Sequence, residues 1–144
     1  MSQTILVTGS AGFIGYFTAA RLVKSNRKVI GIDNLNNYYD KNLKLSRLKE
    51  LRKISNKKKN YKFFKVDICN SRKLKNLFKK YKFKTILHFA AQAGIRFSLK
   101  KPEEYVKSNL SGFFNILDLS RKFKISHLIY ASSSSVYGSN KNLL

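Results

Sequence analysis

The amino-acid sequence predicts an α/β protein built on a doubly wound parallel sheet, with the strand order 3-2-1-4-5. Short apolar runs alternate with longer amphipathic stretches along the chain, which is the pattern of right-handed strand–helix–strand units. A turn with evenly spaced glycines follows the first run, at Gly9-x-x-Gly12-x-x-Gly15. Polar or charged residues that could bind a ligand directly follow several of the other apolar runs. In sheets of this kind, ligands bind at the carboxyl ends of the strands.

Length and composition limit the class of protein. The 144 residues are enough for one domain with a core but not for two. The single cysteine, Cys69, excludes a disulfide framework and favours a reducing compartment. The first residues lack a basic leader, and no apolar run is long enough to span a bilayer. We therefore expect a cytoplasmic protein without a membrane partner.

The chain is strongly basic, with 30 Lys and Arg against 7 Asp and Glu, a formal charge of +23. A nucleic-acid partner is one interpretation, and a lysine-rich coding bias over an ordinary fold is the other. The lysines stand between apolar positions on most expected elements, as on solvated outer faces. We favour the second interpretation and expect no nucleic-acid partner.

The first half of the chain alternates two strands with two helices. Residues 5–7 form a short apolar run typical of a buried strand, and residues 13–25 show helical apolar spacing. Residues 28–32 are the second strand. Asp40 is expected to cap a helix that reaches about residue 55. The apolar stripe of this helix is expected at Leu43, Leu48, Leu51 and Ile54.

The third and fourth strands follow the same pattern. Residues 61–66 form the third strand, and Ser71 is expected to cap the short helix after it. Residues 85–90 form the fourth strand, and His88 within it is expected to be a hydrogen-bonded core residue. A loop is expected over residues 91–101.

The last part of the chain predicts one long helix and a fifth strand. Pro102 suits the first position of a helix that runs to Lys122. The strand at residues 127–131 ends in four serines, and the chain stops soon after, so we expect the sheet to be truncated after this strand. The expected apolar positions of the helix are Val106, Leu110, Phe113, Phe114, Leu117 and Leu119.

The glycine turn predicts a dinucleotide site. Missing Cβ atoms permit a tight turn and close approach of a ligand, and the next helix directs its free N–H groups at a pyrophosphate. Asp33 falls 18 residues after Gly15, a spacing at which an acid accepts ribose hydroxyls of the adenosine. A carboxylate there would repel a 2′-phosphate, which favours NAD over NADP. The alternatives are a purely structural turn and an aspartate that caps a loop.

Asp67 and Ile68 follow the third strand in the same way. Their carboxylate and backbone groups could contact adenine, and the alternative is an Asx turn before Ser71. Arg96 in the expected loop could pair with a sugar carboxylate or a phosphate oxygen, or it could be a solvated loop arginine. Both pairs of interpretations stay open on the residues alone.

Several segments together resemble a known family. The segment Thr8-Gly-Ser-Ala-Gly-Phe-Ile-Gly15 resembles the TGxxGFIG motif of extended short-chain dehydrogenases/reductases. Residues 31–40 followed by Leu43-Lys44, residues 88–96 with Ser98, Pro102 and Tyr105, and residues 130–138 are similar to NAD-dependent epimerases/dehydratases, most narrowly to UDP-glucuronate 4-epimerases. The resemblance runs through the whole chain.

The resemblance implies that residues 1–144 are the N-terminal part of a Rossmann-type NAD-binding domain, without the substrate-binding C-terminal region. It implies a UDP-sugar substrate and no metal, and it leaves a homodimer of the full-length protein open. Ser133 matches the catalytic serine or threonine of the family, and Arg96, Ser134 and Ser135 fall on the substrate side. The implied cofactor-binding residues are Gly9, Gly12, Phe13, Ile14, Gly15, Asp33, Asn34, Asp67, Ile68, Phe89, Ala90, Ala91, Gln92 and Ser108.

The family's general base, a tyrosine in a YxxxK helix, has no acceptable match. Tyr61…Lys65 falls on an expected strand, and Tyr137…Lys141 falls in a turn sequence. We therefore expect the N-terminal part of a longer 4-epimerase that acts by transient oxidation at C4, and we expect the isolated chain to be inactive. The alternatives are a related dehydratase, decarboxylase or reductase, and a non-catalytic NAD- or nucleic-acid-binding protein.

Overall fold

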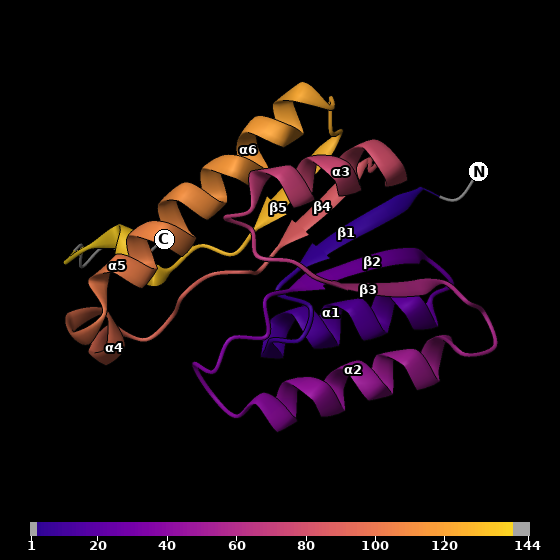
Figure 1. Ribbon diagram of the computed structural model, residues 1–144, viewed down its shortest axis with the longest axis horizontal. Coiled ribbons are helices and arrows are strands. Elements are labelled where there is room, and N and C mark those ends of the chain that lie inside the picture. Colours follow the sequence, from indigo (N-terminus) through magenta and orange to yellow (C-terminus); the bar gives the residue numbers. More distant parts are fainter. Residues whose placement is uncertain (1–2, 140–144) are drawn as a thin grey trace.

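The computed structural model describes residues 3–139 and contains one parallel sheet of five strands. The spatial order is β3-β2-β1-β4-β5, as the sequence predicts (Figure 1). β1 lies at the centre, where Val7 is in register with Gly31 on one side and Leu87 on the other. The strands are β1 (Thr4–Thr8), β2 (Lys28–Asp33), β3 (Tyr61–Lys65), β4 (Thr85–His88) and β5 (His127–Tyr130).

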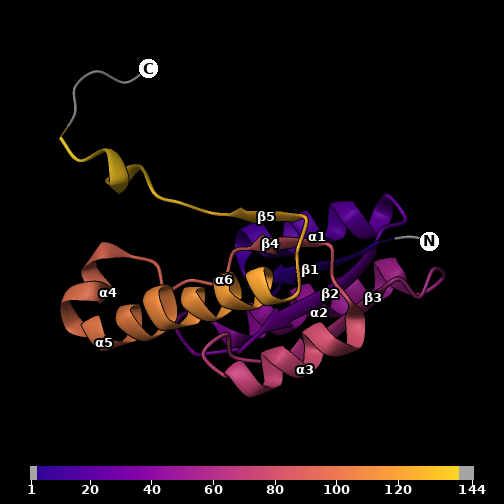
Figure 2. The same ribbon diagram turned by 90° about the horizontal axis from the view of Figure 1, so that it is seen from above.

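Helices cover both faces of the sheet, which makes it doubly wound (Figures 1 and 2). They are α1 (Phe13–Lys24), α2 (Lys41–Ser55), α3 (Ser71–Tyr81), α4 (Ile95–Lys100), α5 (Pro102–Tyr105) and α6 (Phe113–Lys122), with a π-helical segment η1 (Val106–Gly112) and a 3₁₀ segment η2 (Ser134–Tyr137). α1 and α2 pack on one face, and α3 and α6 pack on the other. Both faces of the strands are therefore buried, as their apolar runs predict.

Alternate residues of each inner strand supply two separate cores. On β1, Leu6 belongs to the core under α3 and α6, while Val7 belongs to the core under α1 and α2. Ile30 and Val29 divide in the same way on β2. This alternation follows from the two-residue period of a strand. It holds β1, β2 and β4 rigidly between two layers, so their carboxyl ends have fixed positions.

Three local predictions are wrong. Residues 95–100 of the expected loop form α4. Asn70, not Ser71, caps α3, because its side chain accepts a hydrogen bond from the Lys73 amide at 2.9 Å. The expected helix over residues 102–122 contains the π-helical η1 between α5 and α6.

The apolar faces of two helices also differ from the prediction. In α2, Leu43 is 44% exposed, while the next residue, Lys44, is buried. From α5 to the end of α6, the buried side chains are Ile116 and Leu119. Both lie on the one face of α6 that packs against the sheet and α3. Four of the expected apolar positions point to solvent: Val106, Leu110, Phe114 and Leu117.

Surface composition agrees with the interspersed lysines of the sequence. Apart from Lys44, every lysine in the described part of the chain is exposed. No helix in residues 3–139 has the length and apolar character needed to cross a membrane.

Candidate functional site

The glycine turn connects β1 to α1 and lies against the loop that follows β4. Gly9 has φ +65°, and a Cβ there would lie 2.8 Å from the Ala90 nitrogen. A Cβ on Gly15 would overlap the Gly9 carbonyl oxygen. Gly12 precedes α1, and no side chain caps its first amides. The start of α1 therefore presents its first backbone amides and the positive end of a 12-residue helix to the space above β1.

Thr8 at the end of β1 fixes the loop after β4. Its Oγ1 accepts hydrogen bonds from the Phe89 and Ala90 amides at 3.1 and 3.0 Å and lies 2.7 Å from His88 Nδ1. Because the oxygen already accepts two bonds, its proton goes to Nδ1, so the imidazole is neutral. Burial lowers the pKa of His88 to about 4, which agrees with this assignment. His88 is the hydrogen-bonded core residue that the sequence predicts.

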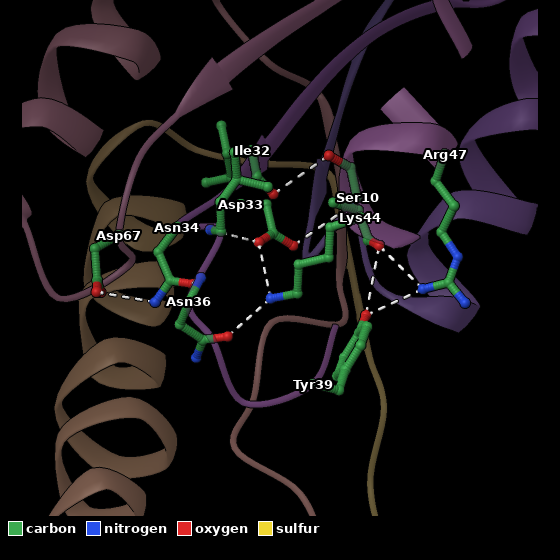
Figure 3. A network of polar contacts seen from close by, with 11 residues as sticks. Ser10, Ile32, Asp33, Asn34, Asn36, Tyr39, Lys44, Arg47 and Asp67 are labelled. Carbon is green, nitrogen blue, oxygen red and sulfur yellow. Dashed lines mark hydrogen bonds and ion pairs between the residues drawn. The ribbon is translucent and has the colours of Figure 1, made fainter. Parts of the chain in front are cut away.

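Asp33 ends β2 and connects it to the glycine turn. Its Oδ2 accepts a hydrogen bond from the Ala11 amide at 3.3 Å, and its Oδ1 accepts one from the Leu35 amide at 2.8 Å. The Lys44 ammonium lies 3.4 Å from Oδ1, and both side chains are buried (Figure 3). These bonds hold the carboxylate rigidly beside the turn.

Arg47, one helical turn after Lys44, supports the outer side of the glycine turn. Its Nη1 donates to the Ala11 carbonyl at 3.2 Å and to the Tyr39 hydroxyl at 3.1 Å (Figure 3). Its guanidinium also lies over the Phe13 ring, 5.9 Å from the centroid. α2 therefore carries two cations toward the same turn.

Asp67 follows β3 and lies beside the end of β2. Burial raises the pKa of its carboxyl, but hydrogen bonds from the Cys69 amide and the Asn34 side chain outweigh burial, so the net shift is downward. These bonds measure 2.8 Å and 3.1 Å. Asp67 is thus an ionised acceptor, and Ile68 beside it is 5% exposed. Asp67 also forms the Asx-type contact with Cys69 that the alternative interpretation requires.

A cleft joins these groups at the carboxyl ends of β1, β2 and β4. Its empty volume is about 720 Å³, which includes open solvent at its mouth. Asn109 of η1 fixes its far wall by a pair of bonds to the Gln92 backbone, at 2.8 and 2.9 Å. The predicted cofactor residues that line the cleft are Gly9, Gly12, Asp33, Asn34, Asp67, Ile68, Phe89, Ala90, Ala91, Gln92 and Ser108.

The donor and acceptor groups of this cleft fit a dinucleotide. Backbone amides at the start of α1 match a pyrophosphate, and the carboxylates of Asp33 and Asp67 match hydroxyl and amine donors. Gln92, whose backbone is held by Asn109, is buried in the wall of the same cleft. Within residues 3–139, no group of three His, Cys, Asp or Glu side chains is placed to hold a metal ion.

Other predicted site residues lie outside the cleft. Phe13 and Ile14 are exposed on the first turn of α1, and Gly15 is buried behind the turn. Arg96 is exposed on α4. Ser133, Ser134 and Ser135 are exposed after β5, on a segment that extends away from the sheet (Figure 2). The Ser133 side chain bonds only within this segment in the described structure, to the Ser135 amide and hydroxyl.

Of the two YxxxK matches, the structure describes both residues of the first only, and that pair lacks the expected helical geometry. Tyr61 and Lys65 lie on β3, and burial raises the pKa of Tyr61 to about 12, the direction opposite to that of a general base. Tyr137 lies in the 3₁₀ segment η2. Its partner Lys141 lies outside the described residues.

Sequence reasoning missed Thr8, Lys44 and Arg47 as parts of the cleft and its support. Thr8 and Arg47 act through contacts with residues far away in sequence. Lys44 stands between two leucines in an ordinary amphipathic helix, where the apolar pattern places it outside. Its one available signal was the Leu43-Lys44 pair that took part in the family resemblance.

Fold and cleft together define an α/β dinucleotide-binding domain. The model of the family described as GDP-mannose 4,6 dehydratase matches residues 6–143, so the chain belongs to this family of NAD-dependent epimerases and dehydratases.

Similar proteins agree with this membership. Protein CapI of Staphylococcus aureus is 47% identical over 136 residues, which is 94% of this chain and 39% of CapI. A UDP-glucuronate 4-epimerase of Thermodesulfobacterium geofontis is 46% identical over 132 residues, 92% of this chain and 40% of that protein. The UDP-glucose 4-epimerase of Bifidobacterium longum, solved with NAD⁺ and UDP, has a TM-score of 0.83 at 29% identity, covering 98% of this chain and 40% of its own. The chain thus spans about 40% of the length of these relatives.

Proposed function

We propose that residues 1–144 are the NAD-binding part of a nucleotide-sugar 4-epimerase that acts on UDP-glucuronate. The observation that carries the proposal is the cleft at the carboxyl ends of β1, β2 and β4, with the glycine turn beside Asp33 and Asp67. Relatives named UDP-glucuronate 4-epimerase and a neighbour solved with NAD⁺ and UDP support the cofactor and the substrate class.

Each predicted residue has a role in this proposal. Gly9, Gly12, Phe13 and Ile14 line the pyrophosphate, which accepts hydrogen bonds from the first amides of α1. Asp33 and Asn34 bind the adenosine ribose, while Asp67 and Ile68 contact adenine. The segment 89–92, with Ser108 opposite, runs along the nicotinamide half. Bound NAD supplies the hydride acceptor and donor for reversible oxidation at C4 of the sugar.

The sugar-side roles rest on the family resemblance. Ser133 hydrogen-bonds the C4 hydroxyl, and Ser134 and Ser135 approach the sugar ring. Arg96 pairs with the uronate carboxylate, for which a guanidinium is the matching donor. The general base comes from a YxxxK helix beyond the residues described. A 4,6-dehydratase is the second candidate, because the matching family model carries that description.

Removal of the Asp33 carboxylate tests the cofactor role. We expect Asp33→Ala to weaken NAD binding about 100-fold, because a charged hydrogen bond to the ribose is lost. NADP binding should fall less, so the preference for NAD narrows. Titration calorimetry with both cofactors measures the two dissociation constants.

A matched aspartate provides the control. Asp40 caps α2 by accepting a bond from the Asn42 amide at 2.8 Å and lies outside the cleft. Asp40→Ala should leave both dissociation constants unchanged. An unaltered NAD/NADP preference in Asp33→Ala would contradict the assigned role.

With NAD present, tighter binding of UDP-glucuronate than of UDP-glucose is expected, and the reverse order would assign the site to neutral sugars.

A further inference from the structure

Lys44 contradicts the pattern of the helix that carries it. It is 5% exposed, while its neighbours Leu43 and Leu45 are 44% and 45% exposed. All other lysines in the described part of the chain are exposed. Burial of an ammonium opposes folding unless the charge is compensated. An inverted pattern of this kind is typical of positions selected for a site rather than for packing.

The contacts of Lys44 leave one donor free. Its Nζ lies 2.8 Å from Asn36 Oδ1 and 3.4 Å from Asp33 Oδ1, and it lies over the Tyr39 ring at 5.0 Å (Figure 3). An ammonium has three N–H donors, of which these two oxygens take two. The Lys44 side chain lines the cleft, so the third donor is available there.

The Asp33 carboxylate has few acceptor positions left for a ligand. A carboxylate offers about four lone-pair positions. Three already accept bonds, from the Ala11 amide, the Leu35 amide and Lys44. Asp33 therefore has about one position left for a ligand, too few for both hydroxyls of a ribose.

We propose that Lys44 is a second ligand of the adenosine ribose and that the Asp33–Lys44 pair sets the choice between NAD and NADP. This inference rests on the proposed function. One ribose hydroxyl donates to Asp33, and the other accepts from Lys44. Because the pair carries no net charge, the repulsion of a 2′-phosphate by Asp33 is partly offset. The preference for NAD is consequently weaker than the aspartate alone would give.

Variants that remove one charge at a time should shift the preference in opposite directions. Lys44→Met leaves Asp33 uncompensated, so NADP binding should weaken more than NAD binding and the NAD/NADP preference should rise about tenfold. Asp33→Asn leaves Lys44 uncompensated, so the preference should move toward NADP by a similar factor of about ten. Lys49→Met changes an exposed lysine of the same helix and should alter neither constant.

Titration calorimetry of the purified protein with NAD and with NADP measures the preference, and thermal unfolding checks each variant. Equal weakening of both cofactors in Lys44→Met would show a purely structural role and overturn the inference. If Lys44→Met does not fold, Lys44→Gln, which keeps a donor but not the charge, decides, because an unchanged preference there also overturns the inference. Wild-type protein that binds NAD, with a preference that changes in Asp33→Asn but not in Lys44→Met, contradicts this inference alone. Wild-type protein that binds neither cofactor contradicts the proposed function as well.

Discussion

The adenosine end and the sugar end of the proposed site are stabilised differently. At the adenosine end, buried Asp33 bonds to Ala11 and to buried Lys44, which lie on other parts of the fold. At the sugar end, Ser133 is exposed and bonds to Ser135, two positions away. Tertiary contacts therefore fix one end, while local bonds set the other. Substitutions at the two ends should have very different costs.

The largest expected effect is a difference in the free energy of unfolding between alanine substitutions at two glycines. Gly15→Ala places a Cβ on the Gly9 carbonyl oxygen and should lower the free energy of unfolding by about 3 kcal/mol or more. Gly138 also has a positive φ, +60°, but a Cβ there meets no atom within 4 Å. Gly138→Ala should cost only about 1 kcal/mol, the conformational penalty. Urea unfolding measures both values, and equal costs would contradict the contrast between the two ends.

The second effect is a pH dependence that arises from His88. Its pKa is about 4 in the folded protein, because of burial, against an ordinary value of 6.5. Below pH 6.5 the unfolded chain takes up a proton that the folded protein does not, so stability falls as the pH falls from 6.5 toward 4. The loss should total about 3 kcal/mol across this window. Urea unfolding at several pH values between 4.5 and 7 measures the slope.

His88→Asn provides the control for this slope. An amide oxygen can still accept the Thr8 proton, but the side chain does not titrate. Asp67 contributes to the pH dependence of stability only at lower pH, because its pKa is shifted downward from the ordinary value of 3.8. The variant should therefore show a flatter pH dependence between 4.5 and 7. The same slope in both proteins would exclude His88 as its source.

The sequence predicts the strands well because each apolar run reflects burial on both faces. The five strands and their order follow from those runs and from the rules of parallel connections. Positions of Asp33 and Asp67 at strand ends follow directly. Their site roles stay predictions, but the structure places both in one cleft.

The missing features depend on distant contacts or on fine helix geometry. Thr8 bonds to residues about 80 positions away, which no local pattern encodes. Apolar spacing does not distinguish the α-helical from the π-helical turns of η1, where Gly112 packs against Ile68. Lys44 points into the protein although the amphipathic pattern of α2 predicts that it is exposed. An ion pair with Asp33 takes the place of apolar packing at this position.

The smallest expected effect is at Ser133. Its bonds are local and exposed, so Ser133→Ala should change the free energy of unfolding by less than about 0.5 kcal/mol and leave NAD affinity unchanged. Binding of UDP-glucuronate to the NAD-loaded protein should weaken about tenfold, since one hydrogen bond to the sugar is lost. Urea unfolding and calorimetry measure the three quantities. A large loss of stability would mean that tertiary contacts also fix the sugar end, and unchanged sugar affinity would remove Ser133 from the substrate site.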